Sequence, residues 1–421
     1  MVKTKKQIVL SLFLIAFCVS CNQYFLPEVK PVPSQKELVT VLHGQSTSDP
    51  GLEEMMIKTI KRDCPEVLIE WESMDWGEDF SGEMRARIAA GNLEDIIIGK
   101  AQDVYSYYGS GCLSSFSEEF TKNILPEALQ SVTINGQVYG LPYNRLYQGV
   151  IYNKNIFYRY GLEVPHTQED LEAICQRLNN VGLTPFAAHF REDWYTANIL
   201  MQFMTNEFLA QDENWGDLFR SGKNNFKDSK EIKNCFDQVE FVYKNSWDDV
   251  SNVNQQDCTM AFAADEAAMF LTGTWTVQTL QTIRPDIEIG IFPYPNSKGN
   301  SKILYEPNIT FMRNVYSSEA ETADKVIAAL IDDIDLAEDI AAFTQTESLR
   351  IGAHPESLKM LQKNLSDYKD PADSIDVSIG NNQLVWHFQD LLAEKSREYL
   401  EDKISLEDLL AFADQNRSLS S

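Results

Sequence analysis

The sequence predicts an α/β fold with two lobes, and two observations support that prediction. Strand-like and helix-like segments alternate between residues 37 and 99, as they do where helices cover the faces of a parallel sheet. The chain has 421 residues, more than a single hydrophobic core usually organises. We therefore expect two lobes, each built on a mainly parallel sheet flanked by helices.

The N-terminal segments follow one another as strand, helix, strand, helix and strand. Apolar residues alternate or form short runs in the strand segments and recur at helical spacing in the helix segments. These elements are expected at residues 37–42, 52–64, 67–71, 84–91 and 95–98. From about residue 315 the pattern is helical, with amphipathic periodicity in residues 320–331, 336–343, 384–400 and 406–414.

The loops that follow the first and third strands are candidate ligand contacts. In open α/β sheets, ligands bind beyond the carboxyl ends of the strands. The first loop contributes His43 and Gln45, and the second contributes Gln102 and Asp103. Polar loop residues are usually only solvated, so each of these side chains also has an explanation that needs no ligand.

Residues 1–20 carry the pattern of a signal peptide. Three lysines precede an uncharged run that ends at Ser20 and is shorter than the roughly 18–20 apolar residues that a membrane-spanning helix needs. The segment Cys18-Val19-Ser20-Cys21 resembles the lipobox of bacterial lipoproteins, although Cys18 stands where that pattern prefers leucine. This resemblance implies that Cys21 is a lipid anchor on the outer face of the cell membrane and that residues 21–35 are a tether. An ordinary cleaved signal peptide is the alternative.

Composition excludes several classes of partner. The chain has 36 Lys and Arg against 63 Asp and Glu, a net charge of −27, which disfavours nucleic acid, anionic lipid and highly anionic ligands. Apart from Cys18 and Cys21, the cysteines are scattered without a CxxC pair, so they indicate neither a disulfide framework nor a zinc site. We expect them to be buried small side chains: Cys64, Cys112, Cys175, Cys235 and Cys258.

The sequence shows no motif for catalysis or cofactor binding. GxSxG, HExxH, phosphate-loop and GxGxxG patterns are absent, and the histidines show no metal-ligand spacing. We therefore expect no catalytic residue, no metal and no cofactor. Acidic residues are too abundant to nominate the carboxylate pair of a glycoside hydrolase, so that class stays open.

Two stretches of the sequence resemble a known family. The first contains GQVYGLP (136–142), VIYNKNIF (150–157) and GLEVP (161–165), and the second contains EAAMFLTGTW (266–275) and IGIFPYP (289–295). They resemble the signatures of family 1 extracellular solute-binding proteins, the group of maltose-, raffinose- and multiple-sugar-binding proteins. Residues 89–97 give a weaker match, with Glu94 where proline usually stands. The matches run in family order from about Leu38 to Trp386.

The resemblance implies a two-lobed, type II periplasmic-binding-protein-like fold with the ligand cleft between the lobes. The chain would cross between lobes near residues 142–148 and 292–295. The N-terminal lobe would comprise residues 36–143 plus 293–325, and the C-terminal lobe residues 146–290 plus 326–421. The implied function is that of a monomeric, lipid-anchored solute-binding protein of an ABC importer, which closes around a carbohydrate, such as an oligosaccharide, and delivers it to the membrane permease.

A sugar site needs aromatic rings against its C–H faces and polar side chains around its hydroxyl groups. The resemblance nominates Trp275, Trp194 and Trp386 as the rings, although packing in an apolar helical face also explains Trp386. The segment after the second crossing contributes Glu306 and Asn308. Tyr143 and Arg145 lie at the first crossing, and Arg145 can bind either hydroxyl groups or a carboxylate, so an acidic sugar stays open.

Three other functions remain compatible with the sequence. An exported glycoside hydrolase would release products, and a glycan-capture lipoprotein would work without a permease. An importer binding protein could instead carry a non-sugar solute such as a polyol phosphate or a peptide. A lipid anchor on a solute-binding protein favours a Gram-positive envelope.

Overall fold

The computed structural model describes residues 37–420 apart from residues 46–49, 76–77, 355 and 369–372. The expected signal peptide, the lipid anchor at Cys21 and the tether lie outside the described residues. Residues 37–421 form one compact unit by their contacts.

Three parallel strands open the fold. β1 (Glu37–Gln45) lies between β2 (Val67–Asp75) and β3 (Ile96–Gly99), and α1 (Pro50–Asp63) and α2 (Glu78–Ala90) connect them. These five elements confirm the predicted order. All four residues of β3 are buried, which agrees with its uninterrupted apolar run.

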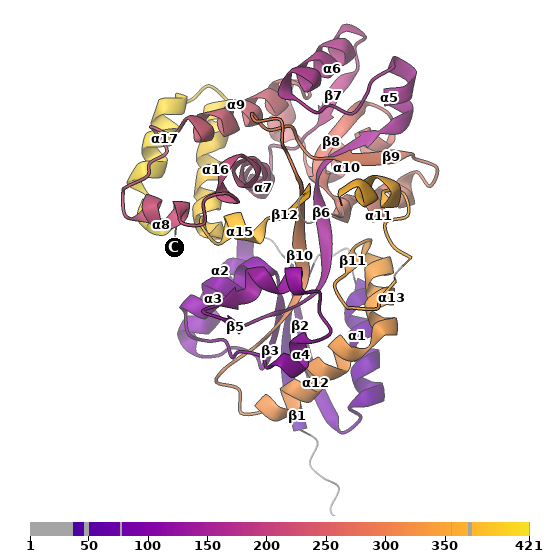
Figure 1. Cartoon of the computed structure of the whole chain (residues 1–421), viewed down its shortest axis with the longest axis vertical. Coiled ribbons are helices and arrows are strands. Elements are labelled where there is room, and N and C mark those ends of the chain that lie inside the picture. The colour runs from indigo at the N-terminus through magenta and orange to yellow at the C-terminus, as the bar shows by residue number, and fades with distance from the viewer. Residues whose placement is uncertain (1–36, 46–49, 76–77, 355, 369–372, 421) are drawn as a thin grey trace, which may run out of the picture. The chain divides into compact units, whose positions relative to one another are not determined.

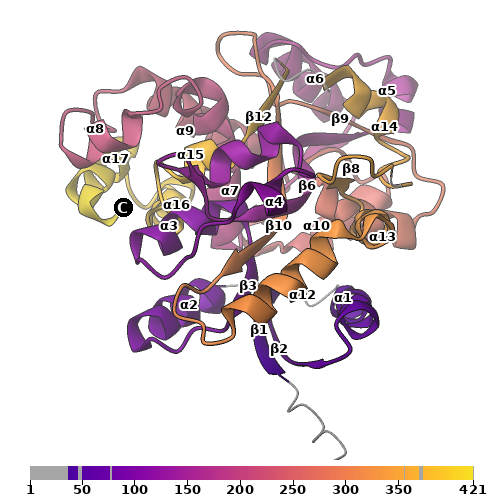
Figure 2. The same ribbon diagram turned by 60° about the horizontal axis from the view of Figure 1, so that its bottom comes forward.

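A C-terminal segment completes the core of this N-terminal part. α12 (Ala320–Asp332) and α13 (Ile334–Thr344) pack against α1, as Figures 1 and 2 show. Ala323 near the start of α12 and Leu330 near its end belong to the same buried cluster as residues of β1 and α1. A lobe boundary at residue 325 would therefore cut a helix that packs with the N-terminal elements at both ends.

The two parts of the fold meet at one long strand, β6 (Leu141–Asn153). Its first half pairs antiparallel with β10 (Ile303–Arg313), and its second half pairs with β8 (Ala267–Gly273) and β9 (Ile289–Phe292). The strand order is β2-β1-β3-β10-β6-β8-β7, where β7 (Thr184–Ala187) runs parallel to β8. β6 and β10 thus run side by side from the N-terminal to the C-terminal half of the sheet (Figure 1).

The structure places the second crossing later than the sequence prediction did. The first predicted crossing, residues 142–148, lies in β6. Of the predicted second crossing at residues 292–295, Phe292 ends β9, and the chain then leaves the sheet because Pro293 and Pro295 have no N–H to donate to a neighbouring strand. The chain rejoins β6 only at β10.

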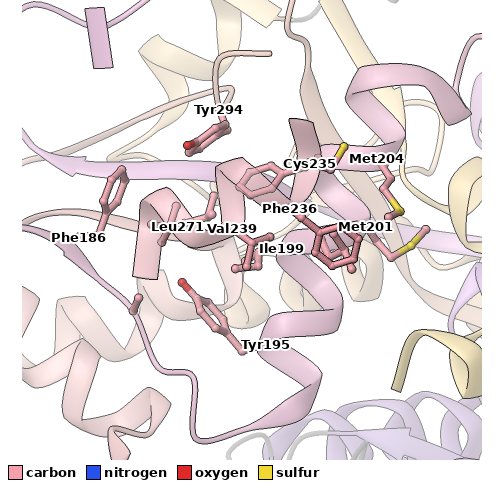
Figure 3. Close-up of a cluster of buried hydrophobic side chains, with 14 of the residues drawn as sticks. Phe186, Tyr195, Ile199, Met201, Met204, Cys235, Phe236, Val239, Leu271 and Tyr294 are labelled. Atoms are coloured by element: carbon pink, nitrogen blue, oxygen red, sulfur yellow. The ribbon is translucent and has the colours of Figure 1, made fainter. Parts of the chain in front are cut away.

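Helices cover the C-terminal sheet and enclose its core. α7 (Asp193–Met204) packs against α9 (Lys230–Lys244) and α16 (Trp386–Leu400). Figure 3 shows buried side chains of this core, among them Tyr195 of α7, Phe236 of α9 and Tyr294, which follows β9. The other helices are α3 (Ala101–Gly109), α4 (Glu118–Thr121), α5 (Lys154–Tyr160), α6 (Gln168–Asn180), α8 (Trp215–Arg220), α10 (Gln255–Ala263), α11 (Val277–Ile283), α14 (Gln362–Leu365), α15 (Ser378–Asn381) and α17 (Leu406–Gln415).

The remaining strands are short, and the cysteines of the folded part are buried. β11 (Glu347–Ser348) pairs with β6, β12 (Ser374–Asp376) pairs with β10, and β4 (Thr133–Ile134) forms a hairpin with β5 (Gln137–Val138). The cysteines from Cys64 to Cys258 are buried and have free thiols. Among the described residues, no helix has both the length and the apolar character to cross a bilayer.

Candidate functional site

A buried group of polar side chains lies where β6 and β10 run side by side. Nε2 of Gln148 on β6 donates to Oε2 of Glu306 on β10 at 2.8 Å. Nζ of Lys100, which follows β3, lies 3.1 Å from Oε1 of Glu306. Only 4% of the Glu306 side chain and 24% of the Lys100 side chain are exposed, so these groups depend on one another for hydrogen bonds.

The same group extends to the C-terminal helices through α7. Nδ2 of Asn198 donates to Oε1 of Gln148 at 3.3 Å, and Nε2 of Gln202 donates to Oδ1 of Asn198 at 2.8 Å. Trp194 stands four residues before Asn198 and therefore shares its face of α7. The Trp194 ring is half-buried, with its centroid 5.2 Å from that of His189.

A second chain of amides joins the two parts of the fold. Nδ2 of Asn381 on α15 donates to Oε1 of Gln102 on α3, and Nε2 of Gln389 on α16 donates to Oδ1 of Asn381 at 3.1 Å. Trp386 stands three residues before Gln389, on the same face of α16. It is half-buried, which leaves part of the ring accessible.

Trp275 lies just beyond the strand that pairs with Gln148. Gly273, the last residue of β8, is the register partner of Gln148, and Trp275 follows in a short turn. The Trp275 ring folds back over Gly273 so closely that a Cβ atom at residue 273 would lie 1.9 Å from the ring. Glycine is thus required at residue 273 for this ring position, and the ring itself is half-buried.

We call the side chains of Lys100, Gln102, Gln148, Asn198, Glu306 and Asn381 the polar belt. It presents amide donors, amide acceptors and one carboxylate. Trp194 and Trp386 each stand within one helical turn of an amide in these hydrogen-bonded chains, and Trp275 follows Gly273, the register partner of Gln148. Such a set suits a ligand with both hydroxyl groups and apolar faces.

Two further carboxyl groups lie beside the polar belt. Asp103 accepts a hydrogen bond from the backbone N of Lys100 at 2.9 Å and so caps α3, and burial raises its pKa to about 6. Asp376 at the end of β12 is 3% exposed and accepts from the backbone N of Ser378 at 2.9 Å. Burial raises the pKa of Asp376 to about 6 as well.

We expect Asp376→Asn to stabilise the protein at neutral pH. Because the pKa of Asp376 is raised in the folded state, the folded protein binds this proton more tightly than the unfolded chain, and the buried charge destabilises it above pH 6. The substitution should raise the free energy of unfolding by about 2 kcal/mol at pH 7.5. Urea titrations at several pH values should show this gain shrinking below pH 6 and vanishing near pH 4, and a gain independent of pH would contradict the assignment.

Two of the predicted ligand contacts, Tyr143 and Arg145, already have hydrogen-bond or ion-pair partners within the protein. The ring of Tyr143 packs edge-on against Phe311, and its hydroxyl donates to the backbone O of Leu330 at 3.2 Å, so Tyr143 belongs to the N-terminal core. Arg145 pairs with Glu347 at 2.9 Å, and its guanidinium lies over the rings of two tyrosines. The structure therefore leaves the charge of Arg145 compensated.

The remaining predicted contacts lie in strands: His43 and Gln45 in β1, which extends beyond the expected loop boundary, and Asn308 in β10. His43 is 1% exposed and meets Trp71 edge-on at 5.6 Å, and burial lowers its pKa to about 4, so it is neutral at physiological pH. Its Nδ1 has no hydrogen-bond partner among the described residues. Asn308 is half-buried at an irregularity in the pairing of β10, and Gln45 ends β1, with a side chain outside the described residues.

Sequence reasoning missed Lys100, Gln148, Asn198 and Asn381. A signal was present for Gln148, which is a polar residue in the otherwise apolar run from Leu146 to Tyr152. Asn198 and Asn381 carry no comparable signal, because their role depends on how α7 and α15 pack. No cluster of side chains able to hold a metal ion occurs in the part of the chain that the structure describes.

Comparisons with known sequences found a matching family and similar proteins. The family model for "Bacterial extracellular solute-binding protein" matches residues 43–333. A multiple sugar-binding protein of Streptococcus mutans is 22% identical over 311 residues, which are 71% of this chain and 72% of that protein.

Solved structures share the fold across nearly the whole chain. A binding protein of Bacillus subtilis in an open conformation has a TM-score of 0.79 at 18% identity, covering 92% of this chain and 98% of that one. A sugar transporter protein of Bacillus licheniformis in complex with stachyose has a TM-score of 0.77 at 14% identity, covering 91% and 100%. These likenesses confirm the predicted two-lobed α/β fold.

Proposed function

The chain belongs to the bacterial extracellular solute-binding proteins, and from this membership we propose that it captures a neutral oligosaccharide and delivers it to the permease of an ABC importer. Membership of this family implies a location outside the cytoplasm. The names of similar proteins support the ligand class, since they include a multiple sugar-binding protein and a protein bound to stachyose.

The polar belt is the observation that carries the proposal. It joins side chains that follow β3 to side chains of α7 and α15 through hydrogen bonds, at the crossing of β6 and β10. A ligand whose hydroxyl groups replace these internal hydrogen bonds would contact both lobes at once. It would then favour the closed arrangement, because a ligand shifts an equilibrium toward the state that it binds better.

The charges near the crossing favour a neutral sugar over an acidic one. Asp103, Glu306 and Asp376 supply three carboxyl groups, against one ammonium group from Lys100. Arg145 does not alter this balance, because Glu347 already neutralises it. A sugar carboxylate would therefore meet repulsion, whereas hydroxyl groups can donate to these acceptors.

A panel of sugars tests the ligand class. We expect a neutral tetrasaccharide, among stachyose, maltotetraose, xylotetraose and chitotetraose, to stabilise the purified protein by about 2.7 kcal/mol at one hundred times its dissociation constant. Tetragalacturonic acid should give no shift. Thermal unfolding measures the shift, and chromatography of each sugar afterwards checks that it is intact.

Each outcome of this panel has a definite meaning. A selective shift with intact sugar supports capture without chemistry, which is how we propose that the protein works. Cleaved sugar would replace the proposal with a glycoside hydrolase. No shift with any sugar would leave a solute-binding protein for a different ligand.

We also propose that Cys21 is the lipid anchor and that the protein acts as a monomer beside its permease. The support is the lipobox-like segment at residues 18–21 and the apolar run before it. Fractionation of cells that express wild type or Cys21→Ser tests the anchor. Wild type should sediment with membranes and the variant should not.

A further inference from the structure

A groove of about 510 Å³ lies on the C-terminal part of the fold, between α6, α9 and the loop of residues 296–299. It is distinct from the polar belt. A much smaller hollow of about 10 Å³ is lined both by Gln148 of the polar belt and by Gln238 and Asn296 of the groove. That volume holds about one water molecule and no sugar, so a ligand in the groove is not a ligand at the crossing.

An amide without a partner in the protein forms part of the groove lining. Gln238 is 7% exposed, and its side chain has no hydrogen-bond partner among the described residues. Its polar atoms reach the groove surface, so the amide can pair with water or with a ligand. Asn234 and Phe241 also line the groove, and their spacing of four and three residues from Gln238 puts all three on one face of α9.

The opposite wall is held rigidly. Glu207 is 1% exposed, and its Oε2 accepts a hydrogen bond from the backbone N of Ser297 at 3.1 Å. Nζ of Lys298 donates to the backbone O of Glu207 at 2.7 Å and to Oε1 of Gln211 at 3.3 Å. The loop is therefore fixed in shape, and the ammonium group of Lys298 already has partners.

The charges that line the groove select against an anionic ligand. Glu169, Glu172 and Asp237 line it and form no ion pair within the described part of the chain, whereas Lys298 supplies a single ammonium group that already has partners. Hydroxyl groups can donate to these carboxylates, and they can both donate to and accept from the amides of Gln238 and Asn234. The amides and the carboxylates together therefore suit a neutral ligand rich in hydroxyl groups.

From these observations we propose that the groove is a second saccharide-binding site, outside the cleft between the lobes. The half-buried ring of Phe241 provides an apolar surface for the C–H face of a sugar, and the amides provide its polar partners. The volume lies within the roughly 300–1,000 Å³ typical of small-molecule sites. The proposal shares only its ligand class with the proposed function and concerns a different surface.

Hydrogen exchange with and without sugar tests the second site on the full mature protein. We expect stachyose or maltotetraose at millimolar concentration to slow exchange in two places, around residues 230–244 of α9 and around β6 and β10. Gln238→Leu should raise the sugar concentration that gives half of the full slowing at α9 at least tenfold. The concentration needed for half of the slowing at β6 and β10 should stay unchanged. The leucine has a similar volume and removes an unpaired amide, so the variant should fold.

Two more measurements make the test decisive. Asn234→Ala, a change at a half-buried position, should weaken the same α9 response. Trp275→Ala should weaken only the response at β6 and β10. If exchange slowed only at β6 and β10, the second site would be overturned and the proposed function would stand. If exchange slowed only at α9, the second site would stand and the proposed binding at the crossing would be overturned. Slowing at α9 by spermidine but by neither sugar would overturn the saccharide assignment in favour of a cation.

Discussion

Gly273→Ala should remove most of the affinity for sugar while the protein stays folded. The added Cβ atom would lie 1.9 Å from Cζ3 of the Trp275 ring, a separation that no side chain tolerates, so the ring has to leave its position over residue 273. A buried aromatic anchor contributes about 2–3 kcal/mol to binding, which corresponds to roughly 30- to 150-fold in the dissociation constant. Isothermal titration with the sugar identified in the panel measures this loss.

Two other variants make that result interpretable. Trp275→Ala should lose a similar amount of affinity, because it removes the same ring. Gly109→Ala is the matched control, since a Cβ atom there would have no neighbour within 4 Å. If Gly273→Ala bound the sugar as tightly as wild type, Trp275 would not be a ligand platform, and circular dichroism would show whether a loss reflects unfolding.

The sequence predicted the order of elements well because their signals are local. The apolar run at residues 96–98 and the helical spacing from Leu52 to Ile60 report burial directly, and the corresponding strand and helix are present. The predicted helices from residue 320 onward also agree with α12, α13, α16 and α17. Periodicity shows that a helix has a buried face, but it does not show which element covers that face. The packing of α12 on α1 was therefore not predicted.

The candidate site was predicted only in part, for a related reason. Glu306 on β10 and Gln102 on α3 lie in the polar belt, and their contact with a ligand stays a prediction, whereas Tyr143 packs in the core and Arg145 pairs with Glu347. A sequence shows which residues are polar, but not which of them find partners inside the protein. Arg145 is the clear case, since its partner lies about two hundred residues away in the chain.

Glu306→Ala should destabilise the protein by about 3 kcal/mol, because it removes the central acceptor of the polar belt. Without the carboxylate, Nε2 of Gln148 loses its bond at 2.8 Å and the ammonium group of Lys100 loses its partner at 3.1 Å, while the carboxyl group of Asp103 still acts on Lys100. Breaking a buried ion pair on one side costs about 3–5 kcal/mol in fully buried pairs. The 24% exposure of Lys100 and the neighbouring carboxyl group of Asp103 place the expected value at the lower end.

Urea unfolding at pH 7.5 measures this loss, and a double variant separates its two causes. Lys100→Met with Glu306→Ala removes both charges, so it should be more stable than Glu306→Ala alone by about 1–2 kcal/mol. The remaining deficit then reports the unpaired amide of Gln148, which costs about 1–3 kcal/mol. If Glu306→Ala unfolded at the same urea concentration as wild type, solvent would already satisfy these groups, and the crossing would be open to water before any sugar binds.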